Sequence, residues 1–168
     1  MNIHFKLTTA LIHAIRADLA RPHEVAAERV GFISCRVAGT NEGIAVLAEA
    51  YQPIADEDYL DDPRVGAMMG PAAIRKALQF AYGERVAMFH VHLHKHRGSP
   101  WFSGLDLREN AKFVPDFWNV RPEFPHGAIV LSSDSVAGLC WFSRAMKPIR
   151  IGNFTMVGTP MQFVRGDL

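Results

Sequence analysis

A run of alternating histidines constrains the fold of this chain more than any other feature. The segment RVAMFHVHLHKH, residues 85–96, carries a histidine at every second position from His90 onward. Successive side chains of a β-strand point to opposite faces, so this alternation places the histidines on one face and apolar residues on the other. The pattern predicts a buried strand over residues 85–94. The histidines of the run are His90, His92, His94 and His96.

The rest of the chain mixes helical and extended patterns, usually with short connections. Thr8 or Thr9 is a suitable helix N-cap, and Pro71 is a suitable first residue for a second helix, which Gly83 would end. Such a mixture is typical of one α/β or α+β layered domain. We expect helices at residues 9–20, 71–82 and 103–112, a further helical turn at 23–28, an exposed acidic loop at 52–70, and strands at 3–7, 31–37, 43–51, 128–131, 139–142 and 149–157.

Length and composition fit a single domain over residues 1–168. With 49% hydrophobic residues, the chain can bury a core without added cross-links. The 18 basic and 17 acidic residues nearly cancel and form no basic stripe, so no nucleic-acid or anionic-membrane partner is expected. Cys35 and Cys140 have apolar neighbours and should be buried structural thiols. Because polar residues interrupt every apolar run, we expect a soluble, cytoplasmic protein.

The histidine run is a candidate metal site. Imidazoles two residues apart on one strand are neighbours and can share an ion, although a solvated polar face would give the same alternation. Ser103 and Asp106 follow after a short loop, at the expected start of a helix. They could simply cap that helix, but Asp106 is also well placed to be a third ligand. Two histidines, one carboxylate and a water make a hydrolytic zinc site.

Such a site needs a general base that is not itself a ligand, and Glu28 is the candidate. It lies directly before an expected strand, where a glutamate is otherwise commonly a solvated helix residue. Glu28-Arg-Val-Gly31-Phe32, the histidine run and Ser103-Gly-Leu-Asp106 together resemble the JAB/MPN family of zinc metalloproteases, also called JAMM, in its prokaryotic deubiquitinase-like branch. WFSGLD and GAIVLSSDSVAGLCWF are similar to the sequences that the family has around its serine and in the following strand pair.

The resemblance covers roughly residues 3–145 and implies one MPN/JAB-like domain. Its fold would be a mixed β-sheet curled around and flanked by helices, with a cytidine-deaminase-like layering. The sequence departs from the family at the histidines, because none is followed by proline and eight residues separate His94 from Ser103, one more than usual. We choose His92 and His94 as the ligand pair, since that choice needs one inserted residue. The pairs His90/His92 and His94/His96 remain alternatives.

The resemblance also implies the roles of these residues. His92, His94 and Asp106 would hold Zn²⁺, Glu28 would be the general base, and Ser103 would donate a hydrogen bond to the developing oxyanion. The implied activity is that of an isopeptidase that cleaves the amide bond after the C-terminal tail of a ubiquitin-like protein, a partner that a bacterial operon would encode with conjugation enzymes.

Three other functions compete with this one. A hydrolase of the same fold could process small peptides or sulfur-carrier proteins. A non-catalytic MPN scaffold module would have lost ligands, whereas this chain keeps Glu28, the histidines, Ser103 and Asp106. A zinc deaminase would need H-x-E and C-x-x-C motifs, and the sequence contains neither.

Overall fold

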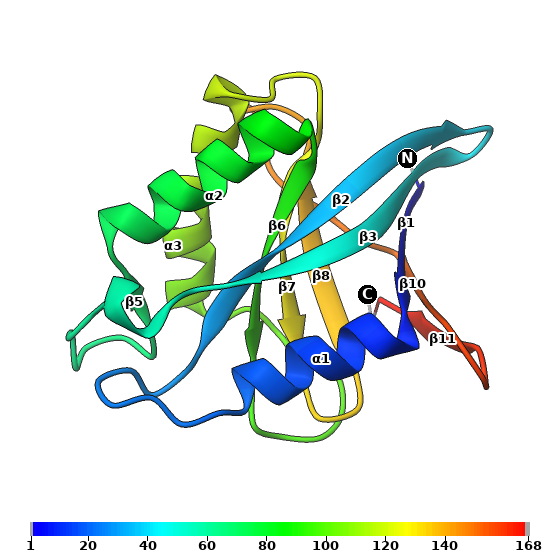
Figure 1. The fold of residues 1–168 in the computed structure, drawn as a ribbon. Coiled ribbons are helices and arrows are strands. Elements are labelled where there is room, and N and C mark those ends of the chain that lie inside the picture. Colours follow the sequence, from blue (N-terminus) through cyan, green and yellow to red (C-terminus); the bar gives the residue numbers. More distant parts are fainter. Residues whose placement is uncertain (1, 167–168) are drawn as a thin grey trace.

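The computed structural model describes residues 2–166, which form a mixed α+β fold built on one large, strongly curled sheet (Figure 1). Its nine strands lie in the order β11-β10-β1-β3-β2-β6-β7-β8-β9, and a separate two-stranded sheet pairs β4 with β5. The strands are β1 (Asn2–Thr8), β2 (Val30–Thr40), β3 (Gly43–Pro53), β4 (Tyr59–Leu60), β5 (Met68–Met69), β6 (Ala87–Leu93), β7 (His126–Leu131), β8 (Val136–Trp141), β9 (Ile149–Arg150), β10 (Asn153–Val157) and β11 (Gln162–Arg165). The helices are α1 (Thr9–Leu19), α2 (Pro71–Glu84) and α3 (Gly104–Phe113), with 3₁₀ helices η1 (Asp56–Asp58) and η2 (Val114–Asn119).

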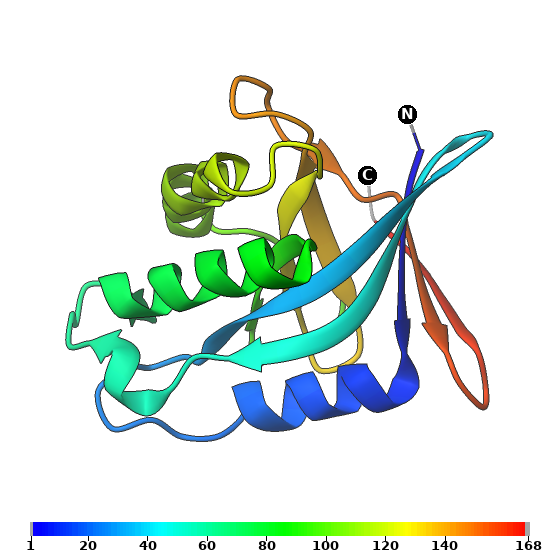
Figure 2. The same cartoon turned by 45° about the horizontal axis from the view of Figure 1, so that its top comes forward.

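The large sheet contains both parallel and antiparallel pairs. Strand β1 runs parallel to both β3 and β10, and β6 runs parallel to β7. The pairs β2–β3, β2–β6 and β7–β8 are antiparallel. Helix α1 lies on one side of the sheet, while α2 and α3 lie on the other (Figures 1 and 2).

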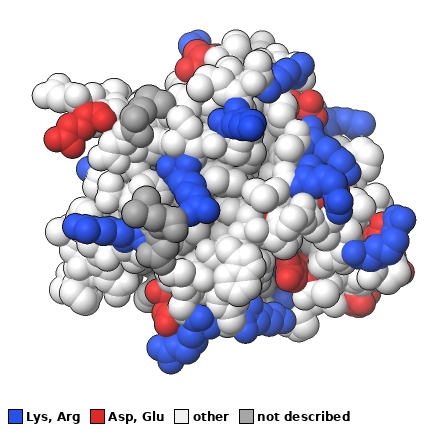
Figure 3. Space-filling model, turned by 180° about the vertical axis from the view of Figure 1, so that it is seen from behind, with Lys and Arg blue, Asp and Glu red and all other residues white. Residues whose placement is uncertain are grey.

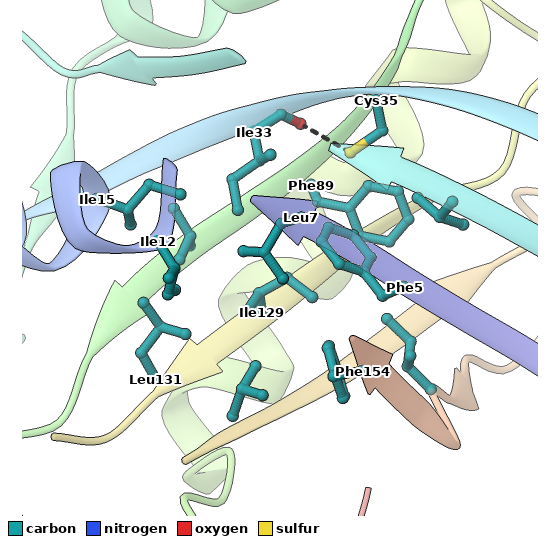
Figure 4. Close-up of a cluster of buried hydrophobic side chains, with 14 of the residues drawn as sticks. Phe5, Leu7, Ile12, Ile15, Ile33, Cys35, Phe89, Ile129, Leu131 and Phe154 are labelled. Atoms are coloured by element: carbon teal, nitrogen blue, oxygen red, sulfur yellow. Dashed lines mark hydrogen bonds between the residues drawn. The ribbon is translucent and has the colours of Figure 1, made fainter. Parts of the chain in front are cut away.

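The core on the α1 side is apolar and explains why β6 is held firmly. Phe89 of β6 packs with Phe5 of β1 and with aliphatic side chains of α1 and β7 (Figure 4). Helix α1 contributes Ile12, Ile15 and Leu19, and begins where the Thr8 hydroxyl accepts a hydrogen bond from the backbone N–H of Leu11. The apolar face of β6 therefore points to α1, and its imidazole face points to α2 and α3.

The two cysteines are buried in this fold, and charges of both signs lie on its surface. Cys35 and Cys140 are both free and buried, as expected from their apolar neighbours. On the face seen in Figure 3, basic and acidic side chains are interspersed and form no stripe of one sign. Within residues 2–166, no helix has both the length and the apolar character that a membrane crossing requires.

The predicted elements are largely present, but several of their boundaries were wrong. Helix α2 continues through Gly83 to Glu84 and ends at Arg85, whose left-handed backbone (φ 54°) closes it, so β6 begins only at Ala87. The expected strand at 149–157 is split, because β9 pairs with β8 and β10 pairs with β1 on the far side of the sheet. Strand β11 was not predicted.

The segments at 23–28 and 52–70 also differ from expectation. Residues 23–28 form no helix, since the His23 ring accepts hydrogen bonds from the N–H groups of Val25 and Ala26, and Arg29 binds the carbonyls of Arg21 and Pro22. Segment 52–70 is not a plain exposed loop, because it contains the end of β3, η1 and the β4–β5 pair.

Candidate metal centre

The imidazole face of β6 lies against α3, as the alternation predicts, but only part of the histidine run belongs to the strand. His90 and His92 are strand residues, and they are 7% and 2% exposed. Strand β6 ends at Leu93, so the prediction of four histidines on one strand face was wrong for His94 and His96. The backbone N–H of His94 still bonds to Leu131 of β7, which fixes the residue at the strand end.

Asp106 reaches the histidines from the first turn of α3. Ser103 is the N-cap of this helix, and its hydroxyl oxygen accepts a hydrogen bond from the Asp106 N–H at 3.1 Å. The Asp106 carboxylate in turn accepts a hydrogen bond from the Ser103 N–H at 2.7 Å, completing a capping box. Capping and ligation are therefore compatible, since the cap itself orients the carboxylate.

Three ligand atoms converge on one point. The Nε2 atoms of His92 and His94 are 3.2 Å apart, and the Asp106 Oδ2 lies 3.6 Å from the first and 3.8 Å from the second. Ligands bound tetrahedrally to zinc at its usual bond lengths are about 3.3 Å from one another. The donor set and its spacing thus fit one zinc ion after a small contraction.

The convergent group excludes the other two histidines. Within residues 2–166, the only histidine, cysteine and carboxylate side chains that converge in this way are His92, His94 and Asp106. His96 instead donates from Nδ1 to the carbonyl of Arg97 and stacks on Trp101. His90 lies deeper, between Phe32 and Phe113. The geometry therefore favours the His92/His94 pair over both alternatives.

Electrostatics keep Asp106 and His94 in the protonation states that a metal requires. Burial would raise the pKa of Asp106, but contact with His92 and the hydrogen bonds with Ser103 hold it well below its usual range. Burial, followed by the influence of His92, lowers the pKa of His94. At neutral pH the site consequently offers an ionised carboxylate and a neutral His94 imidazole, the forms that bind metals.

Glu28 lies beside these residues without joining the ligand set. It lines a cavity of about 70 Å³ together with His92 and Asp106, and its charge acts on His94. The Glu28 N–H bonds to the Gly66 carbonyl at 2.9 Å. A Cβ atom on Gly66 would lie 2.9 Å from the Glu28 carboxyl carbon, so the glycine leaves the space that this side chain occupies.

The neighbours of Glu28 are anchored to the same part of the chain. Arg29 is 3% exposed and forms a two-pronged ion pair with Asp56 of η1. The Tyr59 hydroxyl bonds to both the N–H and the carbonyl of Val30. Segment 54–70 therefore braces the backbone that carries Glu28.

Sequence reasoning missed this brace and the buried Asn110. The acidic, proline-containing composition of segment 52–70 predicts an exposed loop, although Arg29 next to the expected base was a sign that an acidic partner such as Asp56 lay nearby. Asn110 follows Asp106 by one helical turn, and its side-chain N–H donates to the Asp106 carbonyl.

A second, larger cavity adjoins the site on the other side of α3. It measures about 380 Å³, and apolar side chains of the loop before Ser103 and of β8 line much of it. Trp101 stands on its rim, 65% exposed, and its ring also approaches that of His94. Trp101 therefore contacts both this cavity and the converging ligand His94.

Comparison with known proteins adds no assignment. No protein-family model matches the sequence, and no curated protein matches it. The chemistry of the site follows from its geometry, in which two imidazoles and one carboxylate converge next to a glutamate outside that group.

Proposed function

We propose that this protein is a zinc-dependent isopeptidase or peptidase with one MPN/JAB-like domain spanning residues 1–168. The observation that carries the proposal is the convergence of His92 Nε2, His94 Nε2 and Asp106 Oδ2, 3.2–3.8 Å apart, beside Glu28. Two histidines, one carboxylate and an open position form a hydrolytic zinc site. The mixed, curled sheet flanked by helices agrees with the architecture that the sequence resemblance implies.

Each side chain has a separate task in this proposal. When bound, zinc would polarise the scissile carbonyl and make the attacking water more acidic. Glu28 takes the proton from that water and later gives it to the leaving amine. The Ser103 hydroxyl oxygen accepts a hydrogen bond from the Asp106 N–H, so the hydroxyl hydrogen of Ser103 remains available to the developing oxyanion.

The substrate we propose is the C-terminal tail of a ubiquitin-like protein, joined to a lysine or to another adduct. The cavity beside Glu28, about 70 Å³, favours small residues at the scissile bond. Strands β4 and β5 pair with one another, and Met69 of β5 lines that cavity. An extended tail could add to the edge of this short sheet, a common mode of peptide recognition. These features favour an extended tail over a free dipeptide or another small substrate.

The test is whether the purified, zinc-loaded protein cleaves fusions in which the C-terminal tail of a ubiquitin-like protein is joined to a reporter. Glu28→Gln should lower turnover by roughly 10²- to 10⁴-fold while zinc content stays stoichiometric. Absence of cleavage that depends on Glu28 would contradict the proposal. Cleavage restricted to short peptides or to sulfur-carrier proteins would favour the alternative hydrolase, and zinc well below one equivalent would favour a scaffold module.

A further inference from the structure

The three converging ligands are not held equally by local structure. His92 lies inside β6, which pairs with β2 on one side and with β7 on the other. Asp106 is oriented by its capping box with Ser103. His94 follows the last residue of β6, and its backbone N–H donates to the Leu131 carbonyl at 2.9 Å. The position of the His94 ring therefore depends on the loop that this residue begins.

That loop, segment 94–103, joins β6 to α3 and is irregular throughout. We call it the ligand loop, because His94 begins it and Ser103, the N-cap of the helix that carries Asp106, ends it. The His94 Nε2 and Asp106 Oδ2 atoms are 3.8 Å apart, the longest separation in the convergent group. The course of the ligand loop therefore sets the distance between these two ligands.

The turn between β7 and β8, residues 132–135, holds the ligand loop from outside. The Ser133 N–H donates to the His96 carbonyl at 2.9 Å. The Asp134 carboxylate accepts from the Gly98 N–H at 2.7 Å and from the Arg97 Nε at 3.2 Å. Gly98 has a left-handed backbone (φ 86°), which glycine adopts without strain. The ligand loop thus bends at the residue whose N–H is bound to Asp134.

The turn itself is well supported. Ser132 is fully buried, and its hydroxyl oxygen accepts from the Ser135 N–H at 2.9 Å and from the Asp134 N–H at 3.4 Å. The Ser132 N–H donates to the Ser135 carbonyl at 3.0 Å. Arg16 of α1 donates to the same carbonyl at 3.3 Å. The turn therefore connects the ligand loop to the large sheet and to α1.

We propose that Asp134 is a positioning residue for the metal centre, which holds Gly98 and so keeps the ligand loop, with His94, in the arrangement that binds zinc. This inference rests on the metal assignment of the proposed function, and Asp134 itself lies outside the convergent group. The Gly98 N–H, together with Arg97, holds the pKa of Asp134 below its ordinary range. The carboxylate is therefore charged at neutral pH, and a charged acceptor makes a stronger hydrogen bond than a neutral one.

The contact with Gly98 should matter more than the contact with Arg97. The Arg97 side chain is 85% exposed, and exposed ion pairs contribute little to stability. The Gly98 N–H belongs to the backbone, so loss of its acceptor frees the chain four residues after His94. The apparent affinity of a site falls with the fraction of molecules in the binding-competent arrangement. A ligand loop in place in about one molecule in ten would bind zinc about tenfold more weakly.

The test compares zinc dissociation constants, measured by chelator competition, in variants of the full chain. Asp134→Ala should weaken zinc binding about 10- to 100-fold. Asp134→Asn keeps an oxygen that can accept from Gly98, and Arg97→Gln removes only an exposed ion pair, so both should stay within about threefold of the wild type.

The matched control is Asp62→Ala. Asp62 also accepts from a backbone N–H and from a guanidinium, both of Arg64, in a segment that carries none of the converging ligands. Asp62→Ala should therefore bind zinc as the wild type does. Urea unfolding of the metal-free variants measures any general loss of stability.

A double-mutant cycle shows whether Asp134 acts through His94. When Asp134→Ala is added to His94→Ala, zinc binding should weaken by less than about twofold, because the ligand that Asp134 positions is already gone. The visible absorption spectrum of the cobalt-loaded protein reports the coordination of the metal. In Asp134→Ala this spectrum should move toward that of His94→Ala, a change that a loss of stability alone would not produce.

Three results would overturn the inference. The first is an unchanged zinc affinity in Asp134→Ala. The second is an equal loss of affinity in Asp62→Ala, since the effect would then not depend on the ligand loop. The third is a full additional loss when Asp134→Ala is combined with His94→Ala, because Asp134 would then act independently of that ligand.

The two proposals fail in distinguishable ways. If the Asp134 variants change zinc affinity as expected but no ubiquitin-like fusion is cleaved, the proposed function is wrong and the positioning role stands. If cleavage depends on Glu28 while zinc affinity ignores Asp134, only the positioning role is wrong. A wild-type protein that binds no zinc would refute the metal assignment and the positioning role with it.

Discussion

The two sides of the candidate site are built in different ways. The metal side comes from regular structure, because His92 lies on β6 and Asp106 lies in the first turn of α3. The base side is irregular. Glu28 lies in a loop, and hydrogen bonds from residues 28–30 to the distant Asp56, Tyr59 and Gly66 hold that loop in place.

This difference has a functional consequence. Ligand geometry on the metal side is set by strand pairing and by a helix cap, so changes there should act on zinc binding or on the oxyanion. Geometry on the base side is set by contacts between segments 28–30 and 54–70, so changes there should act on turnover and leave zinc in place. Variants on each side can therefore test whether zinc binding and turnover depend on separate parts of the site.

The largest effect on zinc binding is expected at the ligands. His92→Ala and His94→Ala should each weaken zinc binding by roughly 10²- to 10³-fold, since each removes one of three protein ligands. His96→Ala should keep full zinc, because the His96 ring stacks on Trp101 outside the convergent group. Zinc content after gel filtration measures the outcome. Full zinc in both His92→Ala and His94→Ala would show that another pair binds the metal.

Ser103 should give the next largest effect and belongs to the metal side. Ser103→Ala removes both the helix cap and the proposed oxyanion donor. We expect turnover to fall by roughly 10²- to 10³-fold and the free energy of unfolding to fall by about 1 kcal/mol. Ser103→Thr, which keeps the hydroxyl, is the matched control. A Ser103→Ala protein that is less stable but turns over normally would limit Ser103 to capping.

Gly66 tests the base side. In Gly66→Ala the new Cβ atom would lie 2.9 Å from the Glu28 carboxyl carbon, so the base must shift. Because misplacement of a catalytic group by about 1 Å can cost 10²-fold, we expect turnover to fall by up to about that factor at unchanged zinc content. Gly39→Ala is the control, since nothing lies within 4 Å of a Cβ there. Zinc loss in Gly66→Ala would refute the separation of the two sides.

The same difference decides what the sequence could reveal. Alternation and capping are local patterns, so the sequence alone indicates β6, α3, Ser103 and Asp106 as candidates. The place of Glu28 followed only from a resemblance, and its brace was missed because Arg29–Asp56 and Val30–Tyr59 join residues more than 25 positions apart. Periodicity also could not show which two of the four histidines converge with Asp106, because that depends on where β6 ends and on how the chain turns after it.

Buried histidines away from the ligands extend the comparison to neighbouring strands. His126 of β7 has its hydrogen bonds satisfied, as its Nδ1 accepts from the Met88 N–H and its Nε2 donates to the Arg121 carbonyl. His90 of β6 is also buried, between the rings of Phe32 and Phe113, and it interacts with the side chain of Asn110. His126 is thus held by hydrogen bonds to backbone groups, whereas His90 is held by aromatic rings and a side-chain amide.

The smallest effect is a pH dependence of stability that His126 should contribute. Burial lowers the pKa of His126 from 6.5 to about 4, so between these values the unfolded chain binds more protons than the folded one. Stability is therefore complete above pH 6.5 and falls as the pH is lowered toward 4, by at most about 1.4 kcal/mol per unit. Urea unfolding of the metal-free protein at about pH 7 and about pH 5 measures this loss. His126→Phe should lose about 1–2 kcal/mol less than the wild type over that interval, because its ring cannot be protonated. Equal losses in both proteins would mean that His126 is already charged in the fold, which its acceptor bond from Met88 opposes.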